Sequence, residues 1–341
     1  MQTKQTNKGG ASGKSFSLAT LISVLGLVIL GFVLYFGFAY AGQNTGTAIL
    51  FAILITLGFG VLLYGLLYAK GADDHFKGWA VAEVIMLVAF IGGAAATVPV
   101  MSGFLTVNGA SDELSQVAND DLDQISQMIK TFQEKASGNL NTMSTQMESL
   151  VARGNLGQTT TPELQEALRK ASLMGENSTN VSMTDVNAWQ NNWGGYINNV
   201  YDPTSGGEYG PNWQETIDLN RQRIESWSIL DIPQAMNDID ALSAQVSETL
   251  ARLSGEYPFH NIVLNGTRWD DGGIMTLPKE EYKARFKAEC AEKTGFSASG
   301  AVLSAVIFLI ILFNYLVAYR SRKVGIKGGS LLHDGGMILQ P

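Results

Sequence analysis

Four long apolar runs are the feature that most constrains this chain. A helix needs about 20 apolar residues to cross roughly 30 Å of hydrocarbon, so a run of about 18 or more with few charges is a candidate span. The runs cover residues 16–41, 47–69, 78–105 and 296–319. Charged residues make up 16% of the chain, below the roughly 25% typical of soluble domains. We therefore predict an all-α membrane protein with four transmembrane helices.

The positions of lysine and arginine predict the orientation, because short loops rich in these residues stay in the cytoplasm. Outside the long segment between the third and fourth runs, the basic residues lie in the two tails and in the loop after the second run. They are Lys4, Lys8, Lys14, Lys70, Lys77, Arg320, Arg322, Lys323 and Lys327. The loop 42–46 contains none. We expect a multi-pass protein of a bacterial inner (cytoplasmic) membrane, with both termini in the cytoplasm.

This topology divides the chain into five parts. They are a basic cytoplasmic tail (1–15), transmembrane helices one to three (16–105), an extracytoplasmic, periplasmic domain (106–297), a fourth transmembrane helix (298–319) and a cytoplasmic tail (320–341). The outer segment holds 14 Lys and Arg against 27 Asp and Glu, a net charge of −13. Such an acidic surface repels phosphate backbones, so we expect no nucleic-acid partner. The basic flanks favour contact with anionic membrane lipid.

Helical periodicity dominates the outer segment. Ser111 and the acids after it are typical of a helix start, and a heptad-like apolar seam follows, which predicts a helix over 111–153. The seam residues are Leu122, Ile125, Ile129, Phe132, Ala136, Leu140, Met143, Met147 and Leu150. A second helical segment is predicted over 213–254, where Pro233 should kink the helix or open a new one capped by Asp231.

Two long amphipathic segments can bury their apolar faces against each other. We therefore expect an antiparallel helical hairpin, a coiled-coil-like stalk, with an irregular, aromatic-rich tip at 154–212. Beyond the hairpin, the residues around Asn265-Gly266 predict two short strands at 262–264 and 267–269. Pro278 should then open a charged helix with Tyr282, Phe286 and Cys290 on one face.

The residues that usually carry catalysis or bind metals are sparse. His75, His260 and His333 are isolated, and Cys290 is the only cysteine. This pattern contains no metal-ligand spacing, so we expect no metal, no cofactor and no enzymatic activity. Cys290 is expected to be a quiet free thiol, with intermolecular pairing as the alternative. Acid pairs such as Asp120-Asp121 are expected to be solvated.

Two features of the spans are candidate sites. Glu83 is the one acid inside an apolar run, which makes it a functional hypothesis by default; the alternative is a shallow acid paired with Lys70 or Lys77. Small residues four apart on spans three and four predict close helix packing, either within the bundle or against a partner or second copy. These are Ala89, Gly92, Gly93, Ala96, Ala301 and Ala305.

Aromatic residues gathered in an otherwise polar stretch form the candidate partner- or ligand-binding surface. They are Trp189, Trp193, Tyr196, Tyr201, Tyr209 and Trp213. Aromatic side chains among Asn and Gly suit recognition because they bury a large area at modest entropic cost. The alternative is a small core that closes the end of the hairpin.

The layout, with a short first outer loop and a large second one, is similar to that of tetraspanins. That family carries a Cys-Cys-Gly motif in its large loop, and the single cysteine here excludes it. In plan, the stalk also resembles the extracytoplasmic regions of bacterial sensors and of inner-membrane subunits in secretion or motility machines.

Three functions remain open. We favour a structural scaffold subunit whose stalk recruits other envelope proteins, with a homo-oligomer as a further possibility. The second is an extracytoplasmic sensor that lacks its own output domain, and the third is an ion-coupled protein that uses Glu83.

Overall fold

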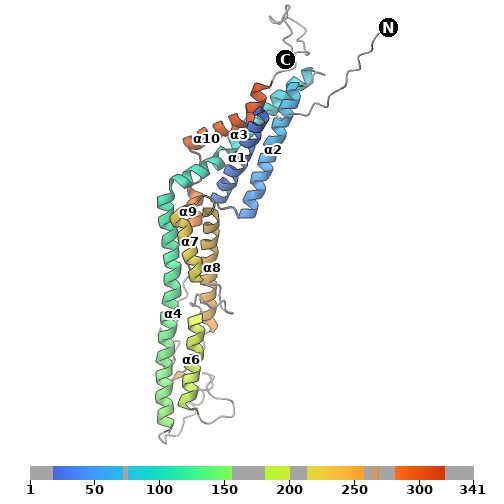
Figure 1. Cartoon of the computed structure of the whole chain (residues 1–341). Helices are drawn as coiled ribbons and strands as arrows, with labels where there is room; N and C mark the ends of the chain where they lie inside the picture. The colour runs from blue at the N-terminus through green and yellow to red at the C-terminus, as the bar shows by residue number, and fades with distance from the viewer. Residues whose placement is uncertain are drawn as a thin grey trace, which may run out of the picture. The chain divides into compact units, whose positions relative to one another are not determined.

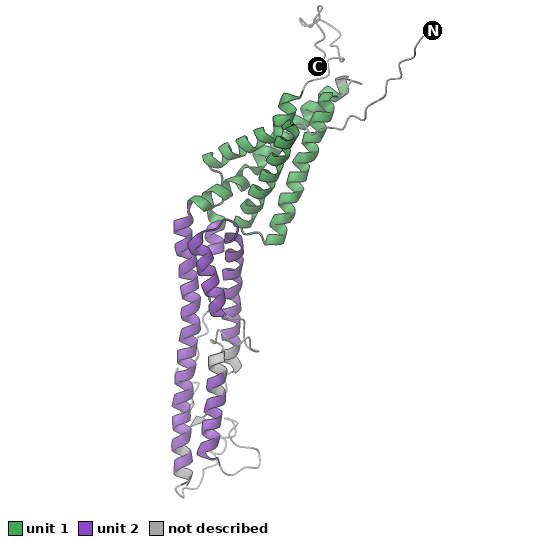
Figure 2. Ribbon diagram, viewed as in Figure 1, with its two compact units in different colours: residues 1–109, 291–341 green, residues 110–290 purple. Residues whose placement is uncertain are grey.

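The computed structural model describes residues 18–71, 76–155, 181–199, 213–256, 263–264, 267–268 and 281–318. The chain forms two compact units (Figure 2), one with residues 1–109 and 291–341 and the other with residues 110–290. We call them unit 1 and unit 2. Within the described ranges the protein has nine helices and one pair of two-residue strands. The predicted all-α architecture is therefore confirmed at this level.

Unit 1 contains the four spans (Figure 1). They are α1 (Leu18–Tyr40), α2 (Thr45–Gly71), α3 (Phe76–Gly109) and α10 (Ala298–Val317). All four are long and apolar enough to cross a membrane, and their outward-facing leucines, valines and isoleucines are widely exposed within the single chain. An apolar outer surface on every helix is what lipid requires. The chain is therefore a multi-pass membrane protein.

The centre of the bundle is held by aromatic rings from three helices. Phe59 of α2 lies 5.1 Å from Phe90 of α3 and 4.8 Å from Phe308 of α10, measured between ring centroids. Phe90 and Phe308 are 5.7 Å apart and nearly perpendicular. Edge-to-face packing of this kind adds to the attraction that area burial alone supplies.

Elsewhere in the bundle, glycine allows helices to meet backbone to backbone. A Cβ added to Gly37 of α1 would collide with the carbonyl oxygen of Val100 in α3, and one added to Gly300 of α10 would lie 2.5 Å from Cα of Ser102. A Cβ on Gly26 would lie 2.9 Å from the side chains of Ile310 and Ile311. Since association in lipid depends on close packing, these glycines fix how the helices fit together.

Unit 2 is organised around α4 (Ser111–Asn155), a 45-residue helix that extends about 67 Å at 1.5 Å per residue. Its bounds agree with the predicted helix over 111–153. Eight of the nine predicted seam residues, from Leu122 to Met147, are buried, and the ninth, Leu150, has a side chain outside the described set. The seam is covered by three other helices of this unit, namely α6 (Met183–Asn199), α7 (Trp213–Ser226) and α8 (Ile232–Glu256).

Helix α6 covers the C-terminal half of α4 and runs antiparallel to it. The hydroxyl of Ser144 lies 3.0 Å from the side-chain oxygen of Gln190, and Gly194 sits against the side chain of Leu140. The start of α6 is closed by a capping box, in which the Asp185 carboxylate accepts from the Ser182 backbone N–H while the Ser182 hydroxyl accepts from that of Asp185. The Ser182 hydroxyl also donates to the Asp185 carboxylate at 2.7 Å, and this bond, together with that from the Ser182 backbone N–H, lowers the pKa of Asp185.

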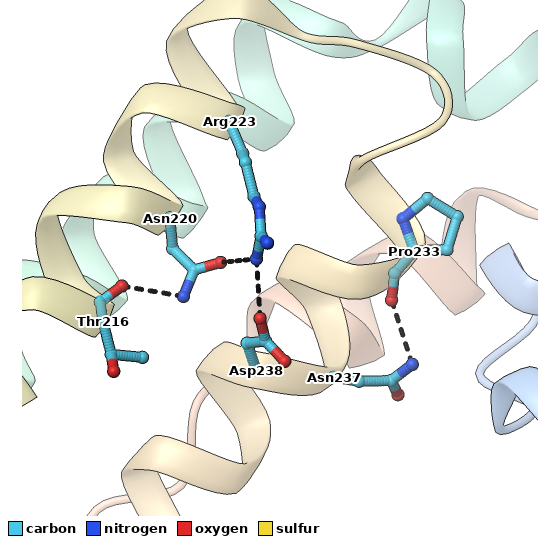
Figure 3. A network of polar contacts seen from close by, with 6 residues as sticks. All are labelled: Thr216, Asn220, Arg223, Pro233, Asn237 and Asp238. Atoms are coloured by element: carbon cyan, nitrogen blue, oxygen red, sulfur yellow. Dashed lines mark hydrogen bonds and ion pairs between the residues drawn. The ribbon is translucent and has the colours of Figure 1, made fainter. Parts of the chain in front are cut away.

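The predicted second arm over 213–254 is two helices, α7 and α8, folded back on each other. The chain turns between them at residues 227–231, and α8 begins at Ile232 with Pro233 in its first turn. Arg223 of α7 hydrogen-bonds Asp238 of α8 at 2.6 Å and also donates to buried Asn220 (Figure 3). Of the two sequence alternatives for Pro233, the structure therefore has a new helix rather than a kink.

This arrangement corrects the simple hairpin of two long arms. Because proline has no N–H and fits the first turn of a helix, the break before it lets α8 reverse direction and pack beside α7. The N-terminal half of α4 consequently packs against both α7 and α8, whereas its C-terminal half packs against α6.

The chain after α8 contains both a confirmed prediction and a correction. The predicted strands are present as β1 (Val263–Leu264) and β2 (Thr267–Arg268), paired antiparallel. The charged helix, however, does not include Tyr282: residues 281–285 are non-helical, and α9 covers only Phe286–Lys293. Phe286 and Cys290 are fully buried and share one face of α9 as expected. Residues 278–280, where the helix was expected to open, lie outside the described ranges.

Candidate functional site

The most elaborate polar site among the described residues centres on Asp121, a fully buried carboxylate of α4. One carboxylate oxygen accepts from the Tyr282 hydroxyl at 2.6 Å. The other accepts from the backbone N–H groups of Arg285 at 2.7 Å and Phe286 at 2.8 Å. Asp121 thus caps α9 from a different helix, where the first N–H groups have no partner within α9 and attract negative charge.

Two serines of α8 hold the same segment from the other side. The Ser247 hydroxyl donates to the carbonyl of Tyr282 at 3.2 Å, and the N–H of Tyr282 lies 3.0 Å from the same hydroxyl oxygen. The Ser243 hydroxyl accepts from the N–H of Ala284 at 3.3 Å while donating to its own helix at Asp240. We call Asp121, Ser243, Ser247 and the segment 281–286 the Asp121 latch.

The latch has a marked electrostatic character. Burial, together with the hydrogen bond to Asp121, raises the pKa of Tyr282 to about 12, so its hydroxyl remains a donor at neutral pH. The Arg285 guanidinium lies 3.6 Å from the Asp121 carboxylate. Its pKa is raised by the hydrogen bond to Tyr282 and by the Asp121 charge. The negative charge of Asp121 is therefore neutralised locally while three hydrogen bonds hold it in place.

An open depression of about 440 Å³ lies beside the latch. The residues that line it are polar or charged and come from α4 and the latch segment: Asp120, Asp123, Gln124, Gln127, Tyr282 and Arg285. Asp123 is also ion-paired with Arg221 of α7. The depression therefore exposes the rim of the latch to water and does not form an enclosed cavity.

The expectation that Asp120-Asp121 is a solvated pair is wrong for Asp121. Asp121 lies three residues after Ala118 and four before Ile125, both fully buried, so it occupies the apolar face of α4. That spacing was the available sequence signal. An acid on a buried face needs partners, and these come from residues more than 160 positions later in the chain.

In unit 1, the acid Glu83 is likewise held by a tyrosine of another helix. It is 7% exposed, and one of its oxygens accepts from the hydroxyl of Tyr315 in α10 at 2.6 Å. The Lys70 ammonium donates to the backbone carbonyl of Tyr315 at 2.5 Å and lies 4.5 Å from its ring centroid. Tyr315 therefore connects Glu83 of α3 with Lys70 of α2. The side chain of Lys77 lies outside the described set.

A second polar contact ties α10 to α1, and the sequence reasoning missed it. The Asn314 side chain donates to the hydroxyl of Thr20 at 3.1 Å, and the Asn314 backbone N–H donates to the hydroxyl of Ser23 at 3.1 Å. Polar residues inside apolar runs were the signal, because such side chains usually hydrogen-bond across helices.

The predicted small-residue positions have different environments within the single chain. Gly93 faces Phe59, where an added Cβ would approach to 3.1 Å, and Ala301 is half-buried. Ala89, Gly92, Ala96 and Ala305 are exposed, and nothing lies within 4 Å of a Cβ added to Gly92. Packing of these four against a partner or a second copy remains a prediction.

The six aromatic residues of the predicted binding surface are only partly described. Trp189 of α6 and Trp213 of α7 are 6% and 4% exposed, so both belong to the interior of unit 2. Trp193 and Tyr196 lie on α6, but their side chains are outside the described set, as are Tyr201 and Tyr209 entirely. For Trp189 and Trp213, burial favours the core alternative over recognition.

Among the described residues, no group of His, Cys, Asp or Glu is arranged to hold a metal ion; the three histidines lie outside these ranges. Cys290 is a buried free thiol, and burial raises its pKa to about 12. Comparison with protein-family models, curated proteins and solved structures finds no match.

Proposed function

We propose that this chain is a structural scaffold subunit of a bacterial inner membrane, with unit 2 as its periplasmic part and both termini in the cytoplasm. The charge distribution supports this orientation. Basic residues flank the spans at the tails and at the loop after the second span, whereas the segment 106–297 has a net charge of −13, from 14 basic and 27 acidic residues. On this topology, α4 and the helices that cover its apolar face lie in the periplasm, where partner proteins can contact them.

The observation that carries the proposal is the way in which unit 2 is made rigid. A 45-residue helix has its apolar face covered by helices of the same chain, so its other face is available to partners. The Asp121 latch fixes the return segment to both α4 and α8. A scaffold benefits from such rigidity, since ordering costs are met within the subunit before a partner binds.

The remaining aromatic residues of the predicted tip are the proposed contact surface for other envelope proteins. Because Trp189 and Trp213 are buried, this role falls to the other four aromatic residues, namely Trp193, Tyr196, Tyr201 and Tyr209. Large aromatic side chains are enriched at the centres of protein interfaces.

Purification in mild detergent with quantitative mass spectrometry of co-eluting proteins tests the proposal. A scaffold should bring envelope proteins in fixed stoichiometry, and a homo-oligomer would appear as a multiple of the 36.7 kDa chain. A double variant, Trp193→Ala and Tyr196→Ala, should release the partners, whereas Glu134→Ala on an exposed position of α4 should retain them. Recovery of the wild-type chain only as a free monomer would overturn the scaffold.

A second candidate, ion coupling through Glu83, is favoured by one observation. Glu83 is buried within a span and hydrogen-bonded to a tyrosine of another span, as expected of a group that could link protonation to helix movement. Glu83→Gln keeps an acceptor for Tyr315 but removes the charge. Loss of the cellular phenotype in this variant, with normal amounts of protein in the membrane, would support coupling; an unchanged phenotype would exclude it.

A further inference from the structure

The turn between α7 and α8 exposes apolar residues that the interior of unit 2 does not need. Leu230 is 66% exposed, the highest value for any large apolar residue of unit 2 in the described ranges. Ile229 beside it is half-buried. The turn is ordered by hydrogen bonds from the N–H groups of Asp231 and Ile232 to the carbonyl of Ser228. Leu230 therefore projects from a fixed turn.

Trp227 begins this turn in an unusual backbone conformation. Its φ of +39° is the one positive value at a non-glycine residue among those described. Glycine usually takes this place after a helix, because a side chain there strains the backbone. The indole packs on Phe286, with ring centroids 6.4 Å apart, and the residue as a whole is half-buried. A strained tryptophan beside an exposed leucine indicates that the turn is built to present apolar surface.

Contacts within unit 2 show at which end this turn lies. The latch segment and α9 run antiparallel to α8, because Tyr282 bonds Ser247 while Lys287 bonds Asn237. Following α9 towards residue 290 therefore leads towards the start of α8, where the turn lies. The chain leaves unit 2 after residue 290 and continues, within eight residues, into α10 at Ala298. The apolar turn is thus at the end of unit 2 from which the chain continues to a span.

We propose that residues 227–231 insert into the interfacial layer of the same bilayer that unit 1 spans. Lipid is the occupant that fits, because tryptophan concentrates at the boundary between headgroups and acyl chains and leucine buries below it. On this side of unit 2, only residues 291–297 separate it along the chain from the start of the fourth span. This contact goes beyond the scaffold proposal and does not depend on any protein partner.

The test uses the full chain in lipid nanodiscs of phosphatidylcholine and phosphatidylglycerol. A spin label is placed at Leu230→Cys, in a Cys290→Ala background, and its collisions with oxygen and with a water-soluble nickel complex are compared. The matched control is Leu219→Cys, the same residue type exposed on α7 and 11 positions earlier. We expect a several-fold loss of nickel collisions and a gain in oxygen collisions at position 230 relative to 219. Equal nickel access at both positions would overturn the proposal.

A second measurement does not require a label. Lipids brominated near the glycerol quench tryptophan fluorescence only on contact, and Trp227→Phe isolates the contribution of this ring. The fluorescence that the variant loses should be strongly quenched in the wild-type protein. If the lost component is insensitive to brominated lipid, Trp227 does not reach the bilayer.

Discussion

Replacing Asp121 should release the segment that leads from unit 2 to the fourth span. In Asp121→Ala, three donors, namely the Tyr282 hydroxyl and the N–H groups of Arg285 and Phe286, lose their acceptor in a buried place. Removing one partner of a buried ionic group costs about 3–5 kcal/mol. Asp121→Asn should cost only about 1–2 kcal/mol, since its oxygen can face the two N–H groups while the Tyr282 hydroxyl reverses to accept.

The chain contains its own reporter for this change. Cys290 is the only cysteine, is fully buried, and lies four residues beyond Phe286 in α9. When the segment opens faster than the reagent reacts, the rate of maleimide labelling follows the open fraction. At about 1.4 kcal/mol per tenfold, labelling should rise between about 10² and 10⁴-fold in Asp121→Ala and roughly tenfold in Asp121→Asn.

The matched control is Asp120→Ala, which removes the neighbouring acid at an exposed position of the same helix. This variant should label at close to the wild-type rate. The reasoning would be refuted if Asp121→Ala and Asp120→Ala labelled alike. It would also be refuted if Asp121→Asn opened the segment as much as the alanine variant, because the acceptor geometry would then contribute nothing.

Two further predictions concern packing and pH. Gly37→Ala should lower the melting temperature in detergent, because overpacking against Val100 costs about 1–3 kcal/mol. Gly92→Ala, which has open space around it, should leave the melting temperature unchanged. Equal effects of the two substitutions would contradict the assigned packing. Burial raises the pKa of Cys290 to about 12 from an ordinary value of 9.0, so the folded state holds the thiol proton more tightly than the unfolded state. The stability that this proton contributes is complete below pH 9 and is lost as the pH rises towards 12. Cys290→Ala should flatten part of the decline in melting temperature from about pH 8 to about pH 11, and an identical decline in both proteins would argue against the assignment.

The features that were predictable from sequence are those set by local pattern. The four spans follow from run length and α4 from its periodicity, and the end of α4 at Asn155 lies two residues from the predicted end at 153. The strand pair around Asn265-Gly266 likewise follows from turn chemistry. In each case the deciding interactions lie within a few residues along the chain.

The features that were not predictable depend on distant partners. The non-helical conformation of residues 281–285 has no local signal, because its hydrogen-bond partners are side chains of α4 and α8. Tertiary capping by Asp121 fixes where α9 begins, overriding the helical pattern that starts at Pro278. The reversal of α8 beside α7 was similarly open, since proline is compatible with both a kink and a new helix.

The chain passes between the two units twice, and the two connections differ in the number of residues outside helix. Only Ala110 separates the end of α3 from the start of α4. In the other connection, residues 294–297 between α9 and α10 are non-helical. The second connection therefore has four residues outside helix, against one in the first.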